Sequence, residues 1–328
     1  MAAPPTISVC VPYGGSRSAL LQQAIDSALA AAPEDAEILI VADGPQATVE
    51  AEQLQLGGRV RVVGAADRGG LAATWNRCLK EAGGELVHLL HDDDAVRPDF
   101  YAAVTGLWER FPGRALYVTG FAYFEGAPDT REPPTDEPAR ELSGQAAAEF
   151  LLRQRRHVCG SVVLAREEVA GAGFNCAFPF CPDEEAYLRW AAQDGLAYDP
   201  RPLYLERMHP AQERYRTWRR PEFVGMYVAA RVGGAGNFGP AAVAEAERLT
   251  AANVTRIALR LAAEGEPQEG AERLAELRAA MPAVEDEPGY RRARRLCETS
   301  LGRVAIRVGG SALLAAFRLR QSLRRRRS

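Results

Sequence analysis

The first 124 residues alternate short apolar, β-branched runs with longer helical patterns, and this alternation limits the fold more than any other feature of the chain. The predicted strands cover residues 6–12, 37–42, 59–64, 85–90 and 115–124, and the helices between them cover residues 18–32, 46–56, 71–82 and 99–111. Strands that alternate with helices of 10–15 residues indicate βαβ units. We therefore expect an α/β fold with a mostly parallel sheet.

Acidic residues follow several of these predicted strands. Asp43 comes directly after the second strand, Asp67 comes shortly after the third, and Asp92, Asp93 and Asp94 come after the fourth. In open α/β sheets, ligands bind beyond the carboxyl ends of the strands. This edge of the sheet is therefore the predicted functional site.

The second half of the chain changes character twice. Residues 125–142 are acidic and rich in proline, which predicts a long loop. A helix near 144–156, a strand at 160–165, a helix at 184–194 and an extended segment at 198–207 follow. After about residue 220 the pattern is helix after helix, so we predict an α/β domain over residues 1–218 and a helical region over residues 219–328.

The basic residues exclude several classes of enzyme. The chain has 40 Lys+Arg and 43 Asp+Glu, but Lys80 is its only lysine, at the predicted end of a helix. P-loop proteins, protein kinases and pyridoxal enzymes each need a lysine in a defined motif, and no such motif is present. The sequence between Gly234 and Gly239 fits GxGxxG, but it lacks the strands of a dinucleotide site, and we interpret it as a hinge before a helix.

The three consecutive aspartates suggest a metal site. Neighbouring carboxylates repel each other and raise each other's pKa unless a cation is present. Mg²⁺ or Mn²⁺ favours one or two carboxylates together with phosphate oxygens. A solvated acidic turn is the alternative, but the apolar strand before Asp92 directs these carboxylates toward the ligand edge.

Several motifs together resemble glycosyltransferase family 2, the inverting enzymes with the GT-A fold. They are ISVCVPYGGSRSALLQQAIDSAL, EILIVADGP, DRGGLAATWNRCLKEAGGELVHLLHDDDAVRPDFY, DEEAYLRWA and ERMHPAQ, and they occur in family order over residues 5–215. The resemblance implies a GT-A fold, with a Rossmann-like mixed sheet, and transfer of a sugar, with inversion, from a nucleotide diphosphate to an acceptor hydroxyl. It also implies Mg²⁺ or Mn²⁺ as the cofactor.

The resemblance also assigns roles to individual residues. Tyr13 matches the aromatic residue that stacks on the nucleobase, or it is a strand-end tyrosine packed in the core. Asp93 or Asp94 is expected to bind the metal directly, with Asp92 near the ribose, and His209 matches a histidine that often closes the donor site. The expected donor-binding residues are Pro12, Tyr13, Asp43, Arg68, Gly70, Asn76 and Asp92, and the expected metal-site residues are Asp93, Asp94 and His209.

The expected catalytic base is Asp183 or Glu184, because DEEAYLRWA resembles the acidic motif that supplies it in the family. Counting back from Arg189 favours Asp183, while side-chain reach favours Glu184. Carboxylates at a helix N-terminus are also stabilised by the helix dipole without any catalytic role. The resemblance decides between these interpretations.

This sequence departs from the family pattern at three positions. Ala42 and His91 stand where the family usually has aspartates, and Trp75 stands where it has arginine. These departures leave two alternatives open: a catalytically inactive GT-A module that serves as a scaffold or binds glycans, and a nucleotidyltransferase. The main hypothesis takes a UDP- or GDP-linked sugar as donor and a glycan or a lipid-linked molecule as acceptor.

The C-terminal residues 300–328 predict a basic amphipathic helix, with Arg303, Arg307, Arg318 and Arg325 on one face. Contact with an anionic membrane surface or packing against protein would both suit it. Nucleic acid is not an expected partner, because no aromatic platform accompanies the arginines. The N-terminal sequence lacks the features of a signal peptide, which predicts a cytoplasmic protein. The predicted basic helix would allow this protein to make peripheral contact with the inner face of the membrane.

Overall fold

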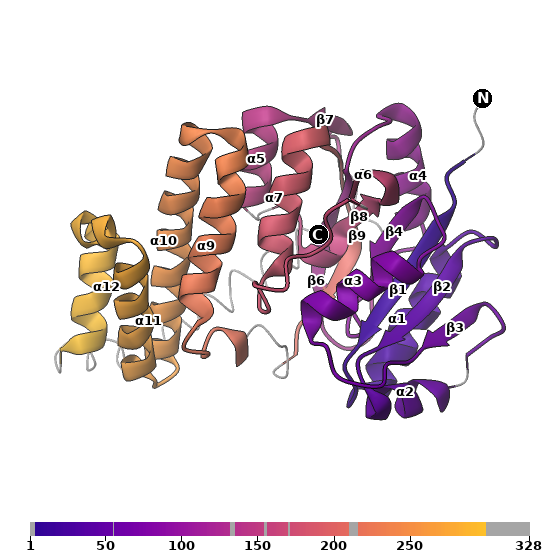
Figure 1. The fold of residues 1–328 in the computed structure, drawn as a ribbon, viewed down its shortest axis with the longest axis horizontal. Helices are drawn as coiled ribbons and strands as arrows, with labels where there is room; N and C mark the ends of the chain where they lie inside the picture. The colour runs from indigo at the N-terminus through magenta and orange to yellow at the C-terminus, as the bar shows by residue number, and fades with distance from the viewer. Residues whose placement is uncertain are drawn as a thin grey trace. The chain divides into compact units, whose positions relative to one another are not determined.

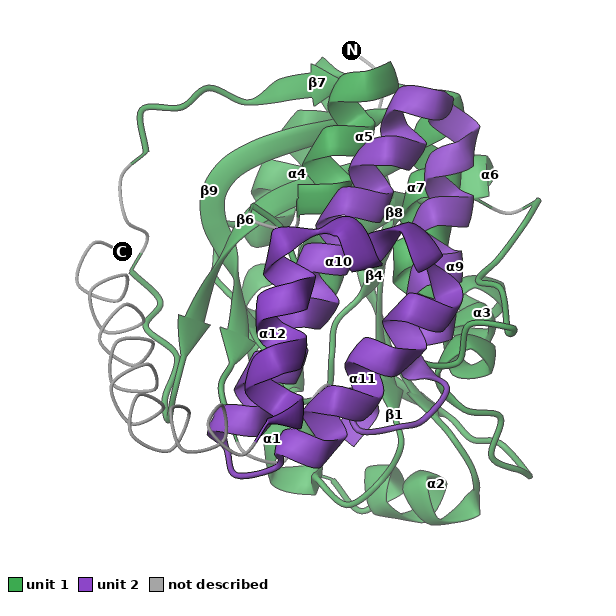
Figure 2. Cartoon of the chain, turned by 90° about the vertical axis from the view of Figure 1, so that its left-hand side faces the viewer, with its two compact units in different colours: residues 1–209 green, residues 210–328 purple. Residues whose placement is uncertain are grey.

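The computed structural model describes residues 4–54, 56–131, 135–153, 156–169, 171–209 and 216–299. The chain forms two compact units, residues 1–209 and residues 210–328 (Figure 1 and Figure 2). The first unit is an α/β domain and the second is helical. The division lies nine residues before the boundary expected from the sequence, at residue 218.

A single nine-stranded sheet forms the first unit, in the order β3-β2-β1-β4-β8-β6-β9-β5, with β7 paired to β9. The strands are β1 (Ile7–Tyr13), β2 (Glu37–Ala42), β3 (Val60–Val63), β4 (Leu86–Leu89), β5 (Ala95–Val96), β6 (Leu116–Phe124), β7 (Arg140–Leu142), β8 (Val162–Ala165) and β9 (Leu196–Arg207). All seven predicted strands are present, within a few residues of their predicted bounds.

The sheet is mixed, as the resemblance to the GT-A fold implies, and β6 and β9 form a parallel pair in its second half. β1 to β4 run parallel, whereas β8 is antiparallel to both β4 and β6, and β5 and β7 are antiparallel to β9. β5 and β7 were not expected at all. They contain two and three residues, too few to show an alternating pattern, and long-range pairing with β9 creates them.

Helices cover both faces of this sheet. They are α1 (Ser18–Ala31), α2 (Pro45–Glu52), α3 (Leu71–Glu81), α4 (Phe100–Arg110), α5 (Gly144–Arg153), α6 (Arg166–Val169) and α7 (Pro182–Asp194). Alternation along β1 sends Val9, Val11 and Tyr13 into the core shared with α1 and α4. Cys10 faces the other way and donates its thiol hydrogen to the carbonyl of Cys78 in α3, at 3.7 Å.

The second unit consists of α9 (Phe223–Ala235), α10 (Pro240–Ala263), α11 (Pro267–Ala280) and α12 (Pro288–Glu298), and α10 packs against the other three. The glycine-rich segment forms a 3₁₀ turn at Gly236–Phe238 between α9 and α10, which confirms the predicted hinge. Among the described residues, no helix combines the length and the apolar character needed to span a membrane. The predicted helix over residues 300–328 lies outside the described residues.

Candidate functional site

A buried turn at the carboxyl end of β4 holds the three aspartates. Asp92, Asp93 and Asp94 are only 4%, 9% and 3% exposed, and the Asp94 amide donates to the carbonyl of His91 at 3.2 Å. The turn runs directly into β5, which pairs with β9. This pairing brings polar groups from residues 204–209 to the acidic turn, more than a hundred residues away along the chain.

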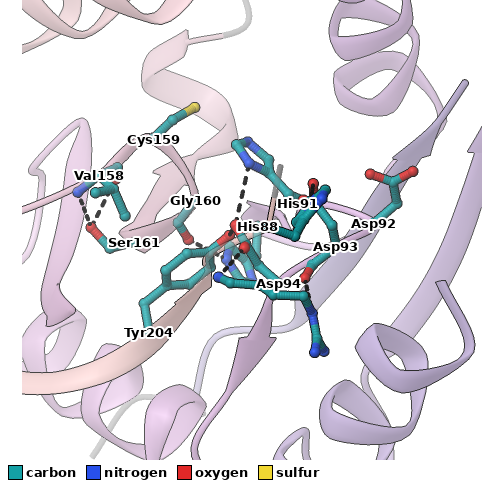
Figure 3. A network of polar contacts seen from close by, with 12 residues as sticks. His88, His91, Asp92, Asp93, Asp94, Val158, Cys159, Gly160, Ser161 and Tyr204 are labelled. Atoms are coloured by element: carbon teal, nitrogen blue, oxygen red, sulfur yellow. Dashed lines mark hydrogen bonds and ion pairs between the residues drawn. The ribbon is translucent and has the colours of Figure 1, made fainter. Parts of the chain in front are cut away.

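Asp94 is fixed by both of its carboxylate oxygens. Oδ2 accepts the hydroxyl of Tyr204 at 2.6 Å, and Oδ1 accepts the backbone N–H of Arg207 at 2.8 Å. His91 Nδ1 lies 3.5 Å from Oδ2, and Figure 3 shows the His91 and Tyr204 side chains converging on Asp94. Burial lowers the pKa of His91, but the Asp94 carboxylate outweighs it, and the pKa lies well above the ordinary value.

Asp93 and Asp92 share the guanidinium of Arg17. Nη1 of Arg17 donates to Asp93 Oδ2 at 2.7 Å and Nη2 donates to Asp92 Oδ1 at 2.8 Å, while His209 Nε2 lies 3.0 Å from Asp93 Oδ2. Burial raises the pKa of Asp93, but Arg17, His91 and His209 more than offset it, so the pKa lies below the ordinary value. Burial raises the pKa of Asp92 to about 7, although Arg17 opposes the shift. Asp92 therefore titrates near neutral pH while Asp93 stays charged.

The layer beneath the acidic turn is made of close contacts around His88. His88 Nε2 donates to the carbonyl of Gly160 at 2.7 Å, so Nδ1 accepts the hydroxyl of Tyr101 at 2.9 Å. Complete burial lowers the pKa of His88 to about 3, which keeps the ring neutral. A Cβ at Gly160 would lie 2.0 Å from the Tyr204 hydroxyl, so only glycine lets Tyr204 reach Asp94.

The segment between β1 and α1 is organised by Glu50 of α2. Its Oε2 accepts the hydroxyl of Tyr13 at 2.6 Å and the backbone N–H of Ser16 at 2.7 Å. The Tyr13 side chain is fully buried, and burial together with Glu50 raises its pKa to about 12. Tyr13 therefore has the surroundings of a strand-end tyrosine packed in the core, which was the alternative to stacking on the nucleobase. Pro12 precedes it in β1, opposite Val41 of β2.

Asp43 shapes the segment that carries Arg68 and Gly70. Its carboxylate accepts the backbone N–H groups of Gly69 at 2.6 Å and Gly70 at 3.2 Å. The Arg68 side chain is 71% exposed, and its Nη2 donates to the carbonyl of Gly14 at 3.2 Å. Asp43 thus fixes the backbone of this loop at the ligand edge of the sheet, while the Arg68 guanidinium stays accessible to solvent.

Asn76 and Trp75 of α3 connect the two halves of the domain. Asn76 donates from Nδ2 to the Phe174 carbonyl at 2.8 Å and accepts the Phe174 N–H at 2.7 Å, so it anchors the segment that leads into α7. Trp75 is buried and stacks on His91, with ring centroids 6.0 Å apart and an interplanar angle of 22°. Two of the three departures from the family pattern, Trp75 and His91, are therefore in contact with each other.

The second acidic group lies in the first turn of α7. Burial and the neighbouring Glu184 raise the pKa of Asp183 to about 7. Asp183 also lies close enough to His91 and Cys159 to interact with both side chains electrostatically. Glu185 instead pairs with Arg189, at 2.7 Å from Nε. Asp183 therefore exchanges a proton near neutral pH close to the acidic turn.

The residues around the turn are chemically suited to a divalent cation. His91, Asp93 and Asp94 each offer one ligand atom, and these three atoms lie within 4.8 Å of one another. Asp92 Oδ2 is buried without a hydrogen-bond partner in the described structure, which is costly unless a ligand satisfies it. His209, expected at the metal site, hydrogen-bonds Asp93 at the edge of this cluster.

Sequence reasoning overlooked several residues that hold the turn: Arg17, Tyr204, Arg207 and the Gly160 carbonyl. Arg207 donates from Nε to the Asp93 carbonyl at 2.7 Å in addition to its backbone bond to Asp94. Arg17 and Arg207 both stand in stretches that resemble the family, so an arginine beside each polar motif was an available signal. The alternating pattern of β9 offered none for Tyr204.

The sequence profile described as "Glycosyl transferase family 2" matches residues 8–172, which is half of the chain. This range includes the acidic turn and Asn76, and it ends before Asp183. No curated protein matches the chain.

Two solved structures illustrate the similarity of the fold. S. aureus TarS 1–349 in complex with UDP-GlcNAc has a TM-score of 0.60 and 16% identity, with 93% of this chain and 89% of that chain covered. The mannosyltransferase PcManGT from Pyrobaculum calidifontis, in complex with GDP-Man and Mn²⁺, has a TM-score of 0.53 and 18% identity, with 94% and 88% covered. Such low identities show the GT-A fold alone, and the profile match shows the family. The chain belongs to glycosyl transferase family 2, and it combines a GT-A domain with a helical C-terminal region.

Proposed function

We propose that the chain transfers a sugar from a UDP- or GDP-linked donor to an acceptor hydroxyl, with inversion and with a divalent cation, in glycan or polysaccharide synthesis. One observation carries the proposal: the buried turn of residues 91–94 groups three metal-ligating atoms and leaves Asp92 Oδ2 without a partner among the described residues. The ligands of TarS and PcManGT, UDP-GlcNAc and GDP-Man with Mn²⁺, support a donor of this class.

Asp93, Asp94, His91 and His209 are the residues that would hold Mg²⁺ or Mn²⁺. His91 binds as a ligand only after losing the proton that the Asp94 carboxylate favours, so part of the binding energy is spent on deprotonation. The cation, when bound, supplies stabilisation of the negative charge that develops on the departing nucleoside diphosphate. Oxygen donors from two aspartates suit either ion.

The donor-binding residues act through charge and through backbone placement. The exposed Arg68 guanidinium lies at the ligand edge of the sheet and would pair with the diphosphate. Asp43 keeps the Arg68–Gly70 loop in place, and Asp92 would accept a ribose hydroxyl at its unpartnered Oδ2. Pro12 and Tyr13 lie in the adjacent β1, where the Tyr13 carbonyl accepts the Asp43 N–H at 2.8 Å. Asn76 contributes indirectly, because it anchors the segment before α7.

Asp183 is the favoured general base, and Glu184 is the alternative. A carboxylate with a pKa of about 7 is a stronger base than an ordinary aspartate and is half ionised at neutral pH. It would take the proton of the acceptor hydroxyl as the oxygen attacks the anomeric carbon opposite the leaving group. Asp183 lies outside the residues that the family profile matches, so this role depends on the geometry of α7 and on the resemblance of DEEAYLRWA.

The test is a panel of UDP- and GDP-sugars, each incubated with the full-length protein and Mn²⁺ or Mg²⁺ in the absence of acceptor. We expect slow, cation-dependent release of UDP or GDP from one donor, and a loss of release with EDTA. NMR of the freed sugar should show the anomer opposite to that of the donor. Nucleotide binding without turnover by any donor would favour the inactive module. In a parallel incubation with UTP or GTP and a sugar 1-phosphate, formation of the nucleotide sugar with release of pyrophosphate would favour a nucleotidyltransferase.

The acceptor, the location and the role of the tail are further parts of the proposal. The acceptor is a glycan or a lipid-linked molecule, the protein is cytoplasmic, and residues 300–328 make peripheral contact with the inner face of the membrane. The eight arginines of residues 298–328 support the membrane contact. Co-sedimentation with anionic liposomes should fall when residues 300–328 are removed, and equal binding would contradict the contact.

A further inference from the structure

The guanidinium of Arg17 occupies the two aspartates that the proposed donor and metal sites need. It bonds Asp93 Oδ2 at 2.7 Å and Asp92 Oδ1 at 2.8 Å, with one nitrogen to each carboxylate. The side chains of Asp92 and Asp93 are 6% and 13% exposed and the Arg17 side chain is 28% exposed, so solvent screens these charge-assisted bonds only in part.

A network that starts in α2 holds Arg17 in this position. Its backbone N–H donates to the hydroxyl of Tyr13 at 3.2 Å, and Tyr13 in turn donates to Glu50. Ser16, directly before Arg17, has a φ of 72° and is the one non-glycine residue with positive φ in the described part of the chain. Glu50 secures that conformation by accepting the Ser16 N–H, so the chain accepts local strain where it delivers Arg17.

The position of Arg17 has a consequence for any cation at the acidic turn. Asp93 Oδ2 already accepts from Arg17 and from His209, so a cation that takes this oxygen must displace one of them. Asp92 Oδ2 and Trp75 Nε1 are buried without hydrogen-bond partners among the described residues, so Arg17 leaves the cluster incompletely satisfied. The site has room in its bonding for a further ligand.

We propose that Arg17 is a positioning residue that serves as the internal counter-cation of the metal-free site and releases Asp93 when a divalent cation binds. Arg17 keeps Asp92 and Asp93 together against their mutual repulsion and thereby preserves the site for the incoming ion. Its cost is weaker cation binding in the absence of donor. After release, its guanidinium is free for the donor diphosphate, a step that rests on the proposed function.

The experiment measures Mn²⁺ affinity by EPR on the full-length protein without nucleotide. Arg17→Gln should tighten Mn²⁺ binding by about tenfold, because a competitor for Asp93 is removed. Arg17→Lys keeps the charge but loses the forked geometry, and it should tighten binding by about threefold. Arg61→Gln, a change of the same charge at an exposed ion pair with Glu37, should leave the affinity unchanged.

Unchanged or weaker binding in Arg17→Gln would overturn the proposal, as would the absence of Mn²⁺ binding in wild type and in both Arg17 variants. Tighter Mn²⁺ binding in Arg17→Lys than in Arg17→Gln would also overturn it, because a side chain that keeps the positive charge should still compete with the cation. Circular dichroism melts confirm that each variant is folded.

A second readout uses UDP and GDP at saturating Mn²⁺. Arg17→Gln should bind the nucleoside diphosphate about tenfold more weakly, the opposite sign to its effect on Mn²⁺ alone. The Mn²⁺ titration contains no donor, so its result is independent of whether the protein transfers sugars. Loss of the first effect removes the inference about Arg17, whereas absence of sugar transfer removes the proposed function.

Discussion

The two acidic groups at the site, Asp92–Asp94 after β4 and Asp183–Glu185 at the start of α7, differ in what surrounds them. The first is held by Arg17, just before α1, and by Tyr204, Arg207 and His209, which lie in or directly after β9. In the second, Glu185 pairs with Arg189, and burial beside Glu184 dominates the environment of Asp183.

This difference separates holding a charge from exchanging a proton. The cations around Asp93 keep its pKa below the ordinary value, which suits a ligand that must stay ionised. Burial raises the pKa of Asp183 to about 7, which suits a group that takes up a proton at neutral pH. Asp92 is intermediate: it shares Arg17, yet burial raises its pKa to about 7 as well.

Removing the charge of the first group should have the largest effect. Asp93→Asn combined with Asp94→Asn should reduce donor turnover by about 10⁴-fold or more, because cation and diphosphate both lose their binding groups. Turnover is measured as release of UDP or GDP. Asp99→Asn, an exposed aspartate five residues further on, is the matched control and should retain wild-type turnover. Activity of the double variant in EDTA would contradict a metal role.

Removing the proton acceptor should have the next largest effect. Asp183→Asn should lower kcat by about 10²- to 10³-fold, and Glu184→Gln by less than about tenfold. In wild type, log kcat/KM should rise with pH and level off above about pH 7, because only ionised Asp183 accepts the proton. If Glu184→Gln shows the larger loss, the base is Glu184. If both variants keep wild-type rates, α7 does not supply the base.

Asp183→Asn should also stabilise the fold at alkaline pH. The folded-state pKa of Asp183 is raised above its ordinary value, so ionisation costs folding free energy, and stability falls as pH rises from about 4 to 7. Asp183→Asn removes that cost and should raise the free energy of unfolding by about 1–2 kcal/mol at pH 8. The gain, measured by urea unfolding, should vanish near pH 4. A gain of the same size at both pH values would contradict the shifted pKa.

The smallest effect is expected where the two groups are joined. Asn76→Ala removes both hydrogen bonds to the Phe174 backbone and should lower the free energy of unfolding by about 1–2 kcal/mol. Turnover should fall less than in Asp183→Asn, because the start of α7 loses only part of its support. Gln268→Ala, an exposed amide on α11, is the control for stability. A loss of donor binding with unchanged stability would instead indicate direct contact between Asn76 and the donor.

The fold could be predicted largely from the sequence, because β1 to β4 and their helices are long enough to show a hydrophobic period. β5 and β7 could not, since strands of two and three residues exist only through their pairing with β9. The same limit applies to the site. Asp92–Asp94 and Asp183 stand out as acidic runs at element ends, whereas Tyr204 is an ordinary strand residue until β5 and β9 pair.

Two residues that the family resemblance singled out have hydrogen-bond partners that the sequence did not indicate. Tyr13 and Asn76 have partners that sequence spacing does not reveal, Glu50 in α2 and the Phe174 backbone. Glu50 and Phe174 are distant along the chain from Tyr13 and Asn76, so only the tertiary structure brings each pair together. Arg17 was missed for a related reason. Its place in a stretch that resembles the family was a signal, but the sequence does not show that its side chain meets Asp93, 76 residues further along the chain.

The division of labour between the two acidic groups can be tested by calorimetric titration of UDP or GDP in the presence of Mn²⁺. Asp183→Asn should bind the nucleotide within about threefold of wild type while its turnover collapses. Asp93→Asn combined with Asp94→Asn should lose Mn²⁺-dependent binding altogether. Wild-type binding by the double variant, or an equal loss of binding in Asp183→Asn, would contradict the assignment of the first group to cation and donor and the second to proton transfer.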